Sequence, residues 1–456
     1  MSLIKRSREF LPRSATYKRS LRSNFIWNTA GCAVFALSQW GILMVFAKLG
    51  NPTLVGQLVY GIAITTPLFV VTSLQLRSIQ ATDANSRYAL GQYVGLRMLT
   101  TVAALIIAGV VAAIMWVSGS QSALIILSWA FAKAFDSGSD ALYGLFQQSE
   151  RMDYVGVSLI LRGFLAVASV AILFRTSHSA PIALAGLVVG WGAVFILYDI
   201  PVARTLLHQR GLSVNALSGM TETLRPVFDP RQLRPLCLEA APLGIVAFLL
   251  AFQGQVPRYV VAGLLHTREL GLFSAAAYLT FIGAMLVNAL GAPASVRLAQ
   301  YHIAGARRRF RQLMTKLLLV ASVLGIASVI ASALAGGRIL ALLYTNEYSQ
   351  IAGILTMLCV GGAVSYVASF LGYGMTALHR YRVQVPLFLV VVLITLLSCY
   401  YLTRRYGLMG TAAGMLIGNV GQLLMSAVVV WQTTRRDIKR AASGSHQVTG
   451  TEECVS

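Results

Sequence analysis

Long uncharged stretches alternate with short basic or polar segments along the whole chain. The first stretch, residues 23–47, contains 25 residues without a charge. A helix needs about 20 mainly apolar residues to cross the hydrocarbon core of a bilayer, so such a stretch predicts a membrane-spanning helix. The uncharged stretch at residues 98–132 is too long for one span, and residues 118–120 (SGS) supply a break.

The same reasoning predicts twelve spans, six on each side of a polar segment at residues 202–235. They lie at residues 24–47, 54–76, 97–117, 122–147, 154–174, 180–201, 236–257, 269–293, 313–335, 349–373, 383–403 and 408–432. We therefore expect an all-α polytopic membrane protein, with about 12 transmembrane helices in two parallel six-helix lobes around a central cavity.

Composition agrees with a membrane protein and argues against nucleic acid as the partner of this basic chain. Of the 456 residues, 57% are hydrophobic and 11% are charged, against about 25% charged in a typical soluble chain. The chain has 37 Lys and Arg residues and 15 Asp and Glu residues, a net charge of +22. Of the 37 basic residues, 28 lie on the N-terminal segment, on the even-numbered connections between spans with the adjoining span ends, and on the C-terminal tail. The positive-inside rule makes these segments cytoplasmic, both termini included.

These assignments divide the chain into five parts. They are a basic cytoplasmic N-terminus (1–23), an N-lobe (24–201), a cytoplasmic linker (202–235), a C-lobe (236–432) and a cytoplasmic tail (433–456). The first apolar run exceeds the roughly 7 to 15 residues of a cleaved signal sequence. We therefore expect a retained first helix.

Several other functions lack their motifs in this sequence. The five cysteines are scattered without CxxC or CxxH spacing and predict neither a disulfide framework nor a metal site. There is no GxxxxGK[ST] segment, so the chain itself does not use ATP. The predicted external loops are too short for the outer catalytic loops of a membrane sugar polymerase or ligase. We therefore expect no enzyme activity and no cofactor.

Three short motifs recur in the same order in both halves of the chain. Ala47 and Gly56 match Ala262 and Gly271, at offset 215; Arg77 and Gln80 match Arg297 and Gln300, at offset 220; Tyr143-Gly144 matches Tyr373-Gly374, at offset 230. Each half contains six predicted spans, so the halves have the same orientation. This pattern predicts an internal repeat about an axis along the membrane normal.

A polar stripe follows one face of the predicted span at residues 122–147. Its members are three or four residues apart: Lys133, Asp136, Asp140, Tyr143, Gln147 and Glu150. At 100° per residue they occupy an arc of about 100°. Because charges inside a span are costly, these side chains are expected to line a water-filled cavity. The alternative is a pair between Lys133 and Asp136 that stabilises helix packing, with Glu150 solvated at the membrane edge.

Arg162 is the best single candidate for a cation inside a cavity. It lies eight residues into its predicted span, about 12 Å along the helix axis. This depth prevents easy escape of the side chain to the membrane surface. The alternative is a salt bridge between Arg162 and the carboxylates of the polar stripe.

Other charged residues lie closer to the predicted span ends. For Arg77, Arg97 and Arg258, side chains that extend to the membrane surface explain the sequence at least as well as a cavity. Asp199 and Glu239 lie near cytoplasmic span ends, where we expect them to be half solvated. The alternative for both is a role in ion coupling.

The motifs resemble those of bacterial polysaccharide-biosynthesis flippases over about residues 20–435. These flippases belong to the multidrug, oligosaccharidyl-lipid and polysaccharide exporter superfamily. The matching strings fall in order at plausible membrane positions: residues 76–83 (LRSIQATD), 91–93 (GQY), 140–148 (DALYGLFQQ), 158–163 (SLILRG), 241–244 (APLG), 257–259 (PRY), 269–273 (ELGLF) and 307–310 (RRRF).

The resemblance implies a flippase of the bacterial inner membrane that moves a polyprenyl-diphosphate-linked oligosaccharide to the outer leaflet. The product would be exopolysaccharide, capsule or O-antigen, and transport would be ion-coupled, with two lobes alternating in access. It also implies contact with membrane lipids, a polysaccharide polymerase and a chain-length regulator as partners, and no nucleic acid. Carried over to this chain, the substrate-binding residues are Arg162, Arg77, Arg258, Lys133, Tyr143 and Gln147, and the ion-coupling residues are Asp136, Asp140 and Glu239.

A multidrug exporter of the same superfamily is the nearest alternative. Such exporters often carry an acidic residue in the first helix, and residues 24–47 have no charge. The same absence disfavours a lipid II flippase, which usually carries a basic pair there. A general twelve-span facilitator is disfavoured because residues 75–92 lack the GxxxDRxGRR pattern.

Overall fold

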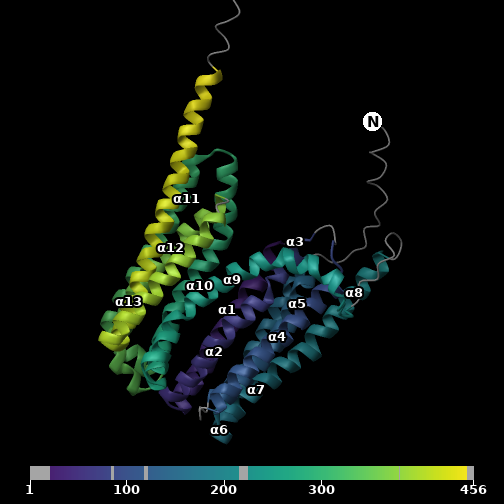
Figure 1. The fold of residues 1–456 in the computed structure, drawn as a ribbon, viewed down its shortest axis with the longest axis vertical. Coiled ribbons are helices and arrows are strands. Elements are labelled where there is room, and N and C mark those ends of the chain that lie inside the picture. The colour runs from purple at the N-terminus through teal and green to yellow at the C-terminus, as the bar shows by residue number, and fades with distance from the viewer. Residues whose placement is uncertain (1–20, 84–86, 118–121, 215–223, 379–380, 449–456) are drawn as a thin grey trace, which may run out of the picture. The chain divides into compact units, whose positions relative to one another are not determined.

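The computed structural model describes residues 21–83, 87–117, 122–214, 224–378 and 381–448, and these contain helices and no strand (Figure 1). The helices are α1 (Leu21–Leu49), α2 (Pro52–Ser73), α3 (Leu76–Thr82), α4 (Leu90–Val117), α5 (Ser122–Gln148), α6 (Met152–Ser177), α7 (Ala180–Val194), α8 (Ile200–Val214), α9 (Pro230–Leu264), α10 (Thr267–Ile303), α11 (Arg307–Leu343), α12 (Ala352–Ala377) and α13 (Tyr381–Val448). A π-helical turn, Phe195–Asp199, joins α7 to α8, and a 3₁₀ turn, Asn346–Ile351, precedes α12.

The predicted all-α architecture with about twelve spans is confirmed. Among the described residues, ten helices are long and apolar enough to cross a membrane. α5 has 27 residues but is less apolar, because it carries Lys133, Asp136 and Asp140. α13 is two helices that meet at Gly407, whose φ of 58° and ψ of −138° interrupt the helix. Glycine adopts this positive φ without the steric cost that a side chain adds.

Several helices are longer than their predicted spans. α10 and α11 each contain 37 residues, about 55 Å of helix, which exceeds a hydrocarbon core of about 30 Å. Their polar ends therefore extend beyond the apolar part that the sequence pattern detects. The break predicted at residues 118–120 lies outside the described residues, as do residues 1–20, 215–223 and 449–456.

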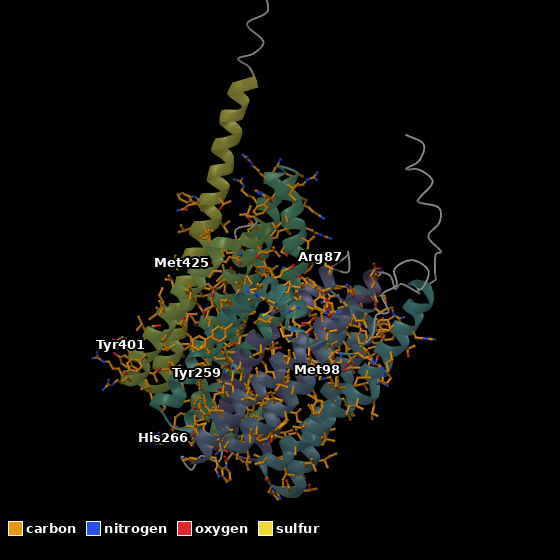
Figure 2. All side chains as sticks on the ribbon, turned by 45° about the vertical axis from the view of Figure 1, so that its right-hand side comes forward. Arg87, Met98, Tyr259, His266, Tyr401 and Met425 are labelled. Carbon is orange, nitrogen blue, oxygen red and sulfur yellow. The ribbon has the colours of Figure 1, made fainter. Side chains whose placement is uncertain are left out.

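The surface of α4 has the character of a lipid-facing helix. Its small residues Ala104, Ala108 and Ala112 are buried, and α4 packs on α5. On another face, large apolar side chains spaced by four are 48 to 66% exposed: Met98 (labelled in Figure 2), Val102, Ile106, Val110 and Ile114. A continuous apolar stripe of this size is stable against lipid and costly in water. The chain is a multi-pass membrane protein.

The chain forms two compact units, residues 1–51 with 60–251 and residues 52–59 with 252–456. In the first unit α5 lies against α3, α4 and α7, while α1 packs along α6. The close approach of α1 and α6 depends on two glycines. A Cβ atom at Gly31 would lie 2.6 Å from the Cα of Gly156, and one at Gly156 would overlap the carbonyl of Trp27. Small residues allow this backbone contact between membrane helices.

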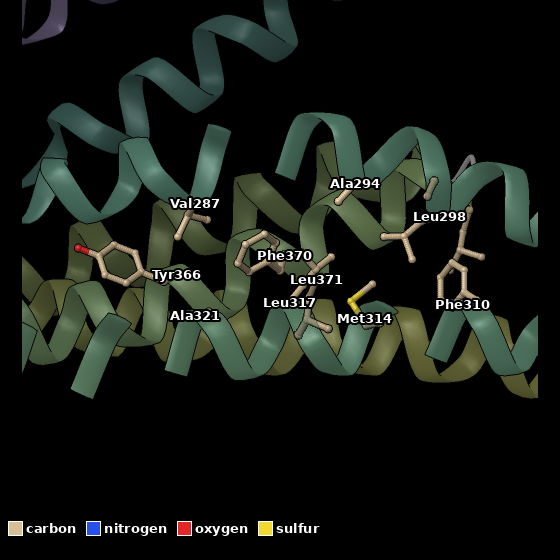
Figure 3. Close-up of a cluster of buried hydrophobic side chains, with 12 residues drawn as sticks. Val287, Ala294, Leu298, Phe310, Met314, Leu317, Ala321, Tyr366, Phe370 and Leu371 are labelled. Atoms are coloured by element: carbon tan, nitrogen blue, oxygen red, sulfur yellow. The ribbon is translucent and has the colours of Figure 1, made fainter. Parts of the chain in front are cut away.

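In the second unit α12 takes the position that α5 takes in the first. It packs on α10, α11 and α13. Figure 3 shows part of this core, where Val287 and Leu298 of α10, Leu317 of α11 and Phe370 of α12 are buried together. α4 packs on α5 in the first unit and α11 packs on α12 in the second. These helices contain the third and fourth predicted spans of each half, and the internal repeat stays a prediction.

A reciprocal contact also involves one pair of repeated positions, Gly56 and Gly271. Both lie in the second unit, because the first turns of α2 pack on the start of α10. A Cβ atom at Gly56 would overlap the carbonyl oxygen of Thr267, and one at Gly271 would overlap that of Pro52. Each glycine thus faces the residue four positions before the other. Such reciprocity is expected of equivalent segments related by a two-fold axis.

We expect Gly156→Ala to lower the apparent melting temperature of the purified, detergent-solubilised protein. The added methyl group meets backbone atoms, and overpacking of this kind costs about 1–3 kcal/mol. Tryptophan fluorescence during heating measures the effect. The matched control is Gly109→Ala in α4, where an added Cβ atom has no neighbour within 4 Å. Equal melting temperatures for the two variants would contradict the close packing of α1 and α6.

Candidate functional site

The polar stripe of α5 collects cations from three neighbouring helices. Asp136 and Asp140 are one turn apart on α5, and each accepts ion pairs from two basic side chains. These bases come from α5 itself and from α3, α4 and α6: Lys133, Arg77, Arg97 and Arg162. The stripe is therefore the centre of an ionic cluster in the first unit.

Asp140 lies between a buried arginine and a half-buried one. The Nη2 of Arg97 is 2.6 Å from Oδ2 of Asp140, and the Nη1 of Arg77 is 3.5 Å from Oδ1. The Arg97 side chain is 7% exposed and that of Arg77 is 28% exposed. Arg97 is thus the closer and less accessible partner of this carboxylate.

Arg97 also holds the point at which α2 breaks. Leu74 and Gln75 have φ values of 49° and 51°, so the helix stops after Ser73 and restarts as α3. The carbonyl of Ser73 then accepts a 2.8 Å hydrogen bond from Nη1 of Arg97, and the carbonyl of Ser137 accepts one of 3.1 Å from Nε. For Arg97, a side chain extended to the membrane surface is therefore wrong, because all three bonds anchor it inside the unit.

Asp136 has the same kind of environment. The Nη2 of Arg162 is 2.6 Å from Oδ1 of Asp136, and the Nζ of Lys133 is 3.0 Å from Oδ2. The Arg162 side chain is 0% exposed and that of Lys133 is 23% exposed. The guanidinium of Arg162 also lies 4.7 Å from the ring centroid of Trp191. Of the two possibilities for Arg162, the structure contains the salt bridge to the stripe.

Tyr143 lies between Arg162 and Arg77, which pair with the two aspartates of α5. Its hydroxyl accepts a 3.3 Å hydrogen bond from Nη1 of Arg162 and forms one of 2.7 Å with the hydroxyl of Ser158. Its ring lies 5.4 Å from the guanidinium carbon of Arg77. Because Tyr143 is 2% exposed, it joins the arginines from inside the unit.

The packing of α3 on α5 sets the position of Arg77. A Cβ atom at Gly144 would overlap the amide of Gln80, so this glycine makes room for α3. With its amide turned to satisfy both ends, Gln80 donates to the carbonyl of Ala141 and accepts from the backbone nitrogen of Leu145, both at 3.2 Å. Two of the repeated motifs thus contact each other in the first unit.

A pocket of about 390 Å³ opens beside Arg77. Its lining is polar: Ser73, Gln75, Arg77, Ser78, Asp140 and Gln147. The Nε of Arg77 donates a 3.2 Å hydrogen bond to Oε1 of Gln147, which is itself exposed. The pocket therefore presents one guanidinium and one carboxylate together with hydroxyl and amide groups.

The charges of the cluster do not cancel. Each aspartate is paired closely with one buried arginine, Arg162 for Asp136 and Arg97 for Asp140. The two more accessible cations, Arg77 and Lys133, share these same two carboxylates, so the cluster has two more cations than carboxylates. The four cations and two carboxylates give a local charge of +2. Such an excess of cations in an apolar environment favours negative charge.

Glu239 belongs to a separate cluster of the first unit. Its Oε2 accepts a 2.9 Å hydrogen bond from the hydroxyl of Tyr88 and lies 3.6 Å from Nη1 of Arg87, which Figure 2 labels. Partial burial and the bond to Glu239 raise the pKa of the Tyr88 phenol. The Glu239 side chain is 42% exposed, in agreement with the expectation that it is half solvated.

Arg258 belongs to the second unit, whereas the other predicted site residues belong to the first. Its Nη1 donates a 2.7 Å hydrogen bond to Oε1 of Gln255, and its guanidinium lies 5.7 Å from the ring centroid of Tyr278. These contacts are local to α9 and α10. They leave its role in substrate binding a prediction.

Asp199 departs from its predicted environment. It ends the π-helical turn after α7 and is 0% exposed, so half solvation is wrong. In the sequence, a buried acidic residue at the end of an apolar run cannot be distinguished from a solvated residue at the membrane boundary. The hydroxyl of Ser139 donates a 2.6 Å hydrogen bond to Asp199, and Ser139 is also fully buried. No sequence pattern indicates this partner. Among the residues described, no group of three or more His, Cys, Asp or Glu side chains is arranged to hold a metal.

We expect Arg97→Ala to destabilise the purified protein by about 3–5 kcal/mol, because it leaves the Asp140 carboxylate with its close partner removed. The loss is measured as a lower melting temperature in detergent. Adding Asp140→Asn should restore part of the stability, since the unpaired charge disappears. Arg87→Ala removes an exposed ion pair and should change stability by less than about 1 kcal/mol. A loss for Arg97→Ala as small as that for Arg87→Ala would disprove the anchoring role.

Comparison with known proteins identifies the family. Residues 21–299 match the family described as polysaccharide biosynthesis protein. The capsular polysaccharide biosynthesis protein CapF of Staphylococcus aureus is 26% identical over 401 residues, which cover 88% of this chain and 97% of that protein. The family resemblance inferred from the sequence motifs is confirmed.

Solved structures of transporters share the fold at low sequence identity. The lipid II flippase MurJ in an inward closed conformation has a TM-score of 0.70 and 13% identity, with 89% of this chain and 87% of that chain covered. An inward-facing multidrug resistance MATE transporter of the MOP superfamily has a TM-score of 0.63 and 12% identity, with 92% and 97% covered. The chain therefore belongs to the polysaccharide biosynthesis protein family and has the fold of MurJ and the MATE transporters of the MOP superfamily.

Proposed function

We propose that this protein is a flippase of the bacterial inner membrane. It moves a polyprenyl-diphosphate-linked oligosaccharide repeat unit to the outer leaflet for synthesis of a surface polysaccharide. The observation that carries the proposal is the local charge of +2 around the two aspartates of α5, on a helix of spanning length. Family membership and the likeness of the fold to transporters support the same conclusion.

In this proposal Arg77 and Lys133 contact the diphosphate. Both are partly exposed, and in both cases a buried arginine already neutralises the shared carboxylate. Guanidinium offers paired donors that match phosphate oxygens, and ammonium adds a compact charge. The 3.5 Å separation of Arg77 from Asp140 is the longest ion pair of the cluster, so this contact is the easiest to exchange for a phosphate.

The other predicted site residues have different tasks in the proposal. Arg162 and Tyr143 are buried, and they hold Lys133 and Arg77 in place through Asp136 and the aromatic ring. Gln147, which is exposed beside the pocket, contacts the sugar adjacent to the diphosphate.

Transport is proposed to proceed by ion-coupled alternating access of the N-lobe and C-lobe, with both termini in the cytoplasm. Roles for Asp136, Asp140 and Glu239 in ion coupling remain predictions. The two α5 aspartates are each held between two cations. A polysaccharide polymerase and a chain-length regulator are the proposed partners at the outer leaflet.

The cluster argues against a multidrug exporter for organic cations. A cationic drug would meet a site of like charge, because Arg77 and Lys133 are the accessible groups. Like charges at close range in a low-dielectric environment repel strongly.

We expect deletion of the gene to leave lipid-linked repeat units in the inner leaflet while their assembly continues. Mass spectrometry of extracted lipid-linked sugars, together with the amount of surface polysaccharide, measures the effect. Unchanged surface polysaccharide in a strain without a second such transporter would refute the proposed function.

In a complementation assay, we expect Arg77→Ala and Lys133→Ala each to reduce surface polysaccharide about tenfold or more. The expected size follows from the loss of a charge-assisted hydrogen bond, about 1.5–3 kcal/mol. Arg204→Ala is the control, because this arginine lies exposed on α8. Expression and melting temperature should remain near those of the unmodified protein. Full export by both variants would show that these cations do not bind the substrate.

A further inference from the structure

Asp199 is a carboxyl group of the first unit that forms no ion pair with the residues that the structure describes. It is fully buried, and its Oδ2 accepts the 2.6 Å hydrogen bond from the hydroxyl of Ser139. The hydroxyl of Ser158 is a second polar neighbour of this carboxyl group, while Oδ1 makes no hydrogen bond among the described residues. By contrast, Asp136 and Asp140 each have two cations, and Asp153 binds Arg151 at 2.9 Å.

The charged groups around Asp199 are shared with the anion-binding cluster. The π-helical turn packs against α5, α6, α7 and α8. Arg162 of α6 and Asp136 of α5 interact electrostatically with Asp199. The phenols of Tyr143 and Tyr198 are also within electrostatic range of Asp199. α7 carries no titratable residue, and Arg204 and His208 of α8 are exposed. The nearest strong cation, Arg162, already binds Asp136 at 2.6 Å.

We propose that Asp199 is a proton-binding site whose protonation state sets the charge of the anion-binding cluster. A buried carboxylate without a close counter-ion is costly, whereas the neutral acid is not. In the protonated form the proton resides on Oδ1 while Ser139 donates to Oδ2. Loss of this proton adds one negative charge beside Arg162 and lowers the local charge from +2 to +1.

The same step changes the contacts of Arg162. The Nε of Arg162 has no hydrogen-bond partner among the described residues, and the charge of Arg162 acts on Asp199. Once Arg162 shares its charge between Asp199 and Asp136, Lys133 becomes the main counter-ion of Asp136. The cluster then binds a diphosphate more weakly. The inference rests on the proposed function, because it assigns a regulating proton to the proposed substrate site.

The location in a π-helical turn agrees with a group that changes state. Such turns occur often at functional sites, because the extra residue disturbs the regular hydrogen bonding of the helix. Pro201, two residues further on, has no N–H group to complete that bonding. The helix is therefore least regular beside Asp199.

Infrared difference spectroscopy of the full-length protein in detergent tests the protonation directly. We expect a carbonyl band of a protonated carboxylic acid that is lost as the pH is raised. The band should be absent in Asp199→Asn and retained in Glu239→Gln. Ser139→Ala should move the band without removing it, since it deletes the hydrogen bond to Oδ2. A wild-type spectrum without a band that depends on Asp199 would overturn the inference, and this outcome involves no substrate.

Binding of farnesyl diphosphate to the same samples tests the link to the cluster. As the pH is raised through the range in which the infrared band disappears, we expect affinity of the unmodified protein to fall about tenfold relative to Asp199→Asn. The titration of the probe is common to both proteins and cancels in the ratio. Equal pH profiles would overturn the link between Asp199 and the cluster. Failure of both proteins to bind, with the infrared band present, would instead contradict the proposed diphosphate site.

Discussion

A carboxylate inside a membrane protein needs a counter-ion, and both aspartates of α5 obtain theirs from buried arginines on neighbouring helices. This requirement organises the first unit. Arg97 of α4 reaches Asp140 and also the carbonyls of Ser73 and Ser137, so one side chain holds α2, α4 and α5 together. Arg162 of α6 makes the equivalent connection through Asp136 and Tyr143.

The proposed function follows from the two cations that remain in excess once each aspartate is neutralised. Two carboxylates are satisfied by two arginines, and two further cations remain at the edge of the cluster. A fully balanced cluster would serve only packing, whereas an excess of positive charge in an apolar setting favours an anion. The accessible cations, Arg77 and Lys133, are therefore the ones to which the proposed diphosphate contact is assigned.

Much of the fold was predictable from the sequence, because span length and helical periodicity are local properties. The stripe from Lys133 to Gln147 follows directly from residue spacing on one helix. The partners of that stripe come from α3, α4 and α6, and spacing along the chain does not show which side chains meet. Arg97 resembles an interfacial residue until the break at Leu74 and Gln75 supplies a carbonyl for it to bind. The burial of Asp199 is not predictable from the sequence, because it depends on the packing of a π-helical turn.

The reciprocal contact of Gly56 and Gly271 has the form of an isologous interface, the kind found in two-fold symmetric dimers. Each partner presents the same short backbone segment to the other, so the contact uses one surface twice. A larger side chain at either glycine would overlap a backbone carbonyl of the opposite segment. Residue size at the two positions is consequently limited together, as it would be at a single position in two identical copies of an ancestral half.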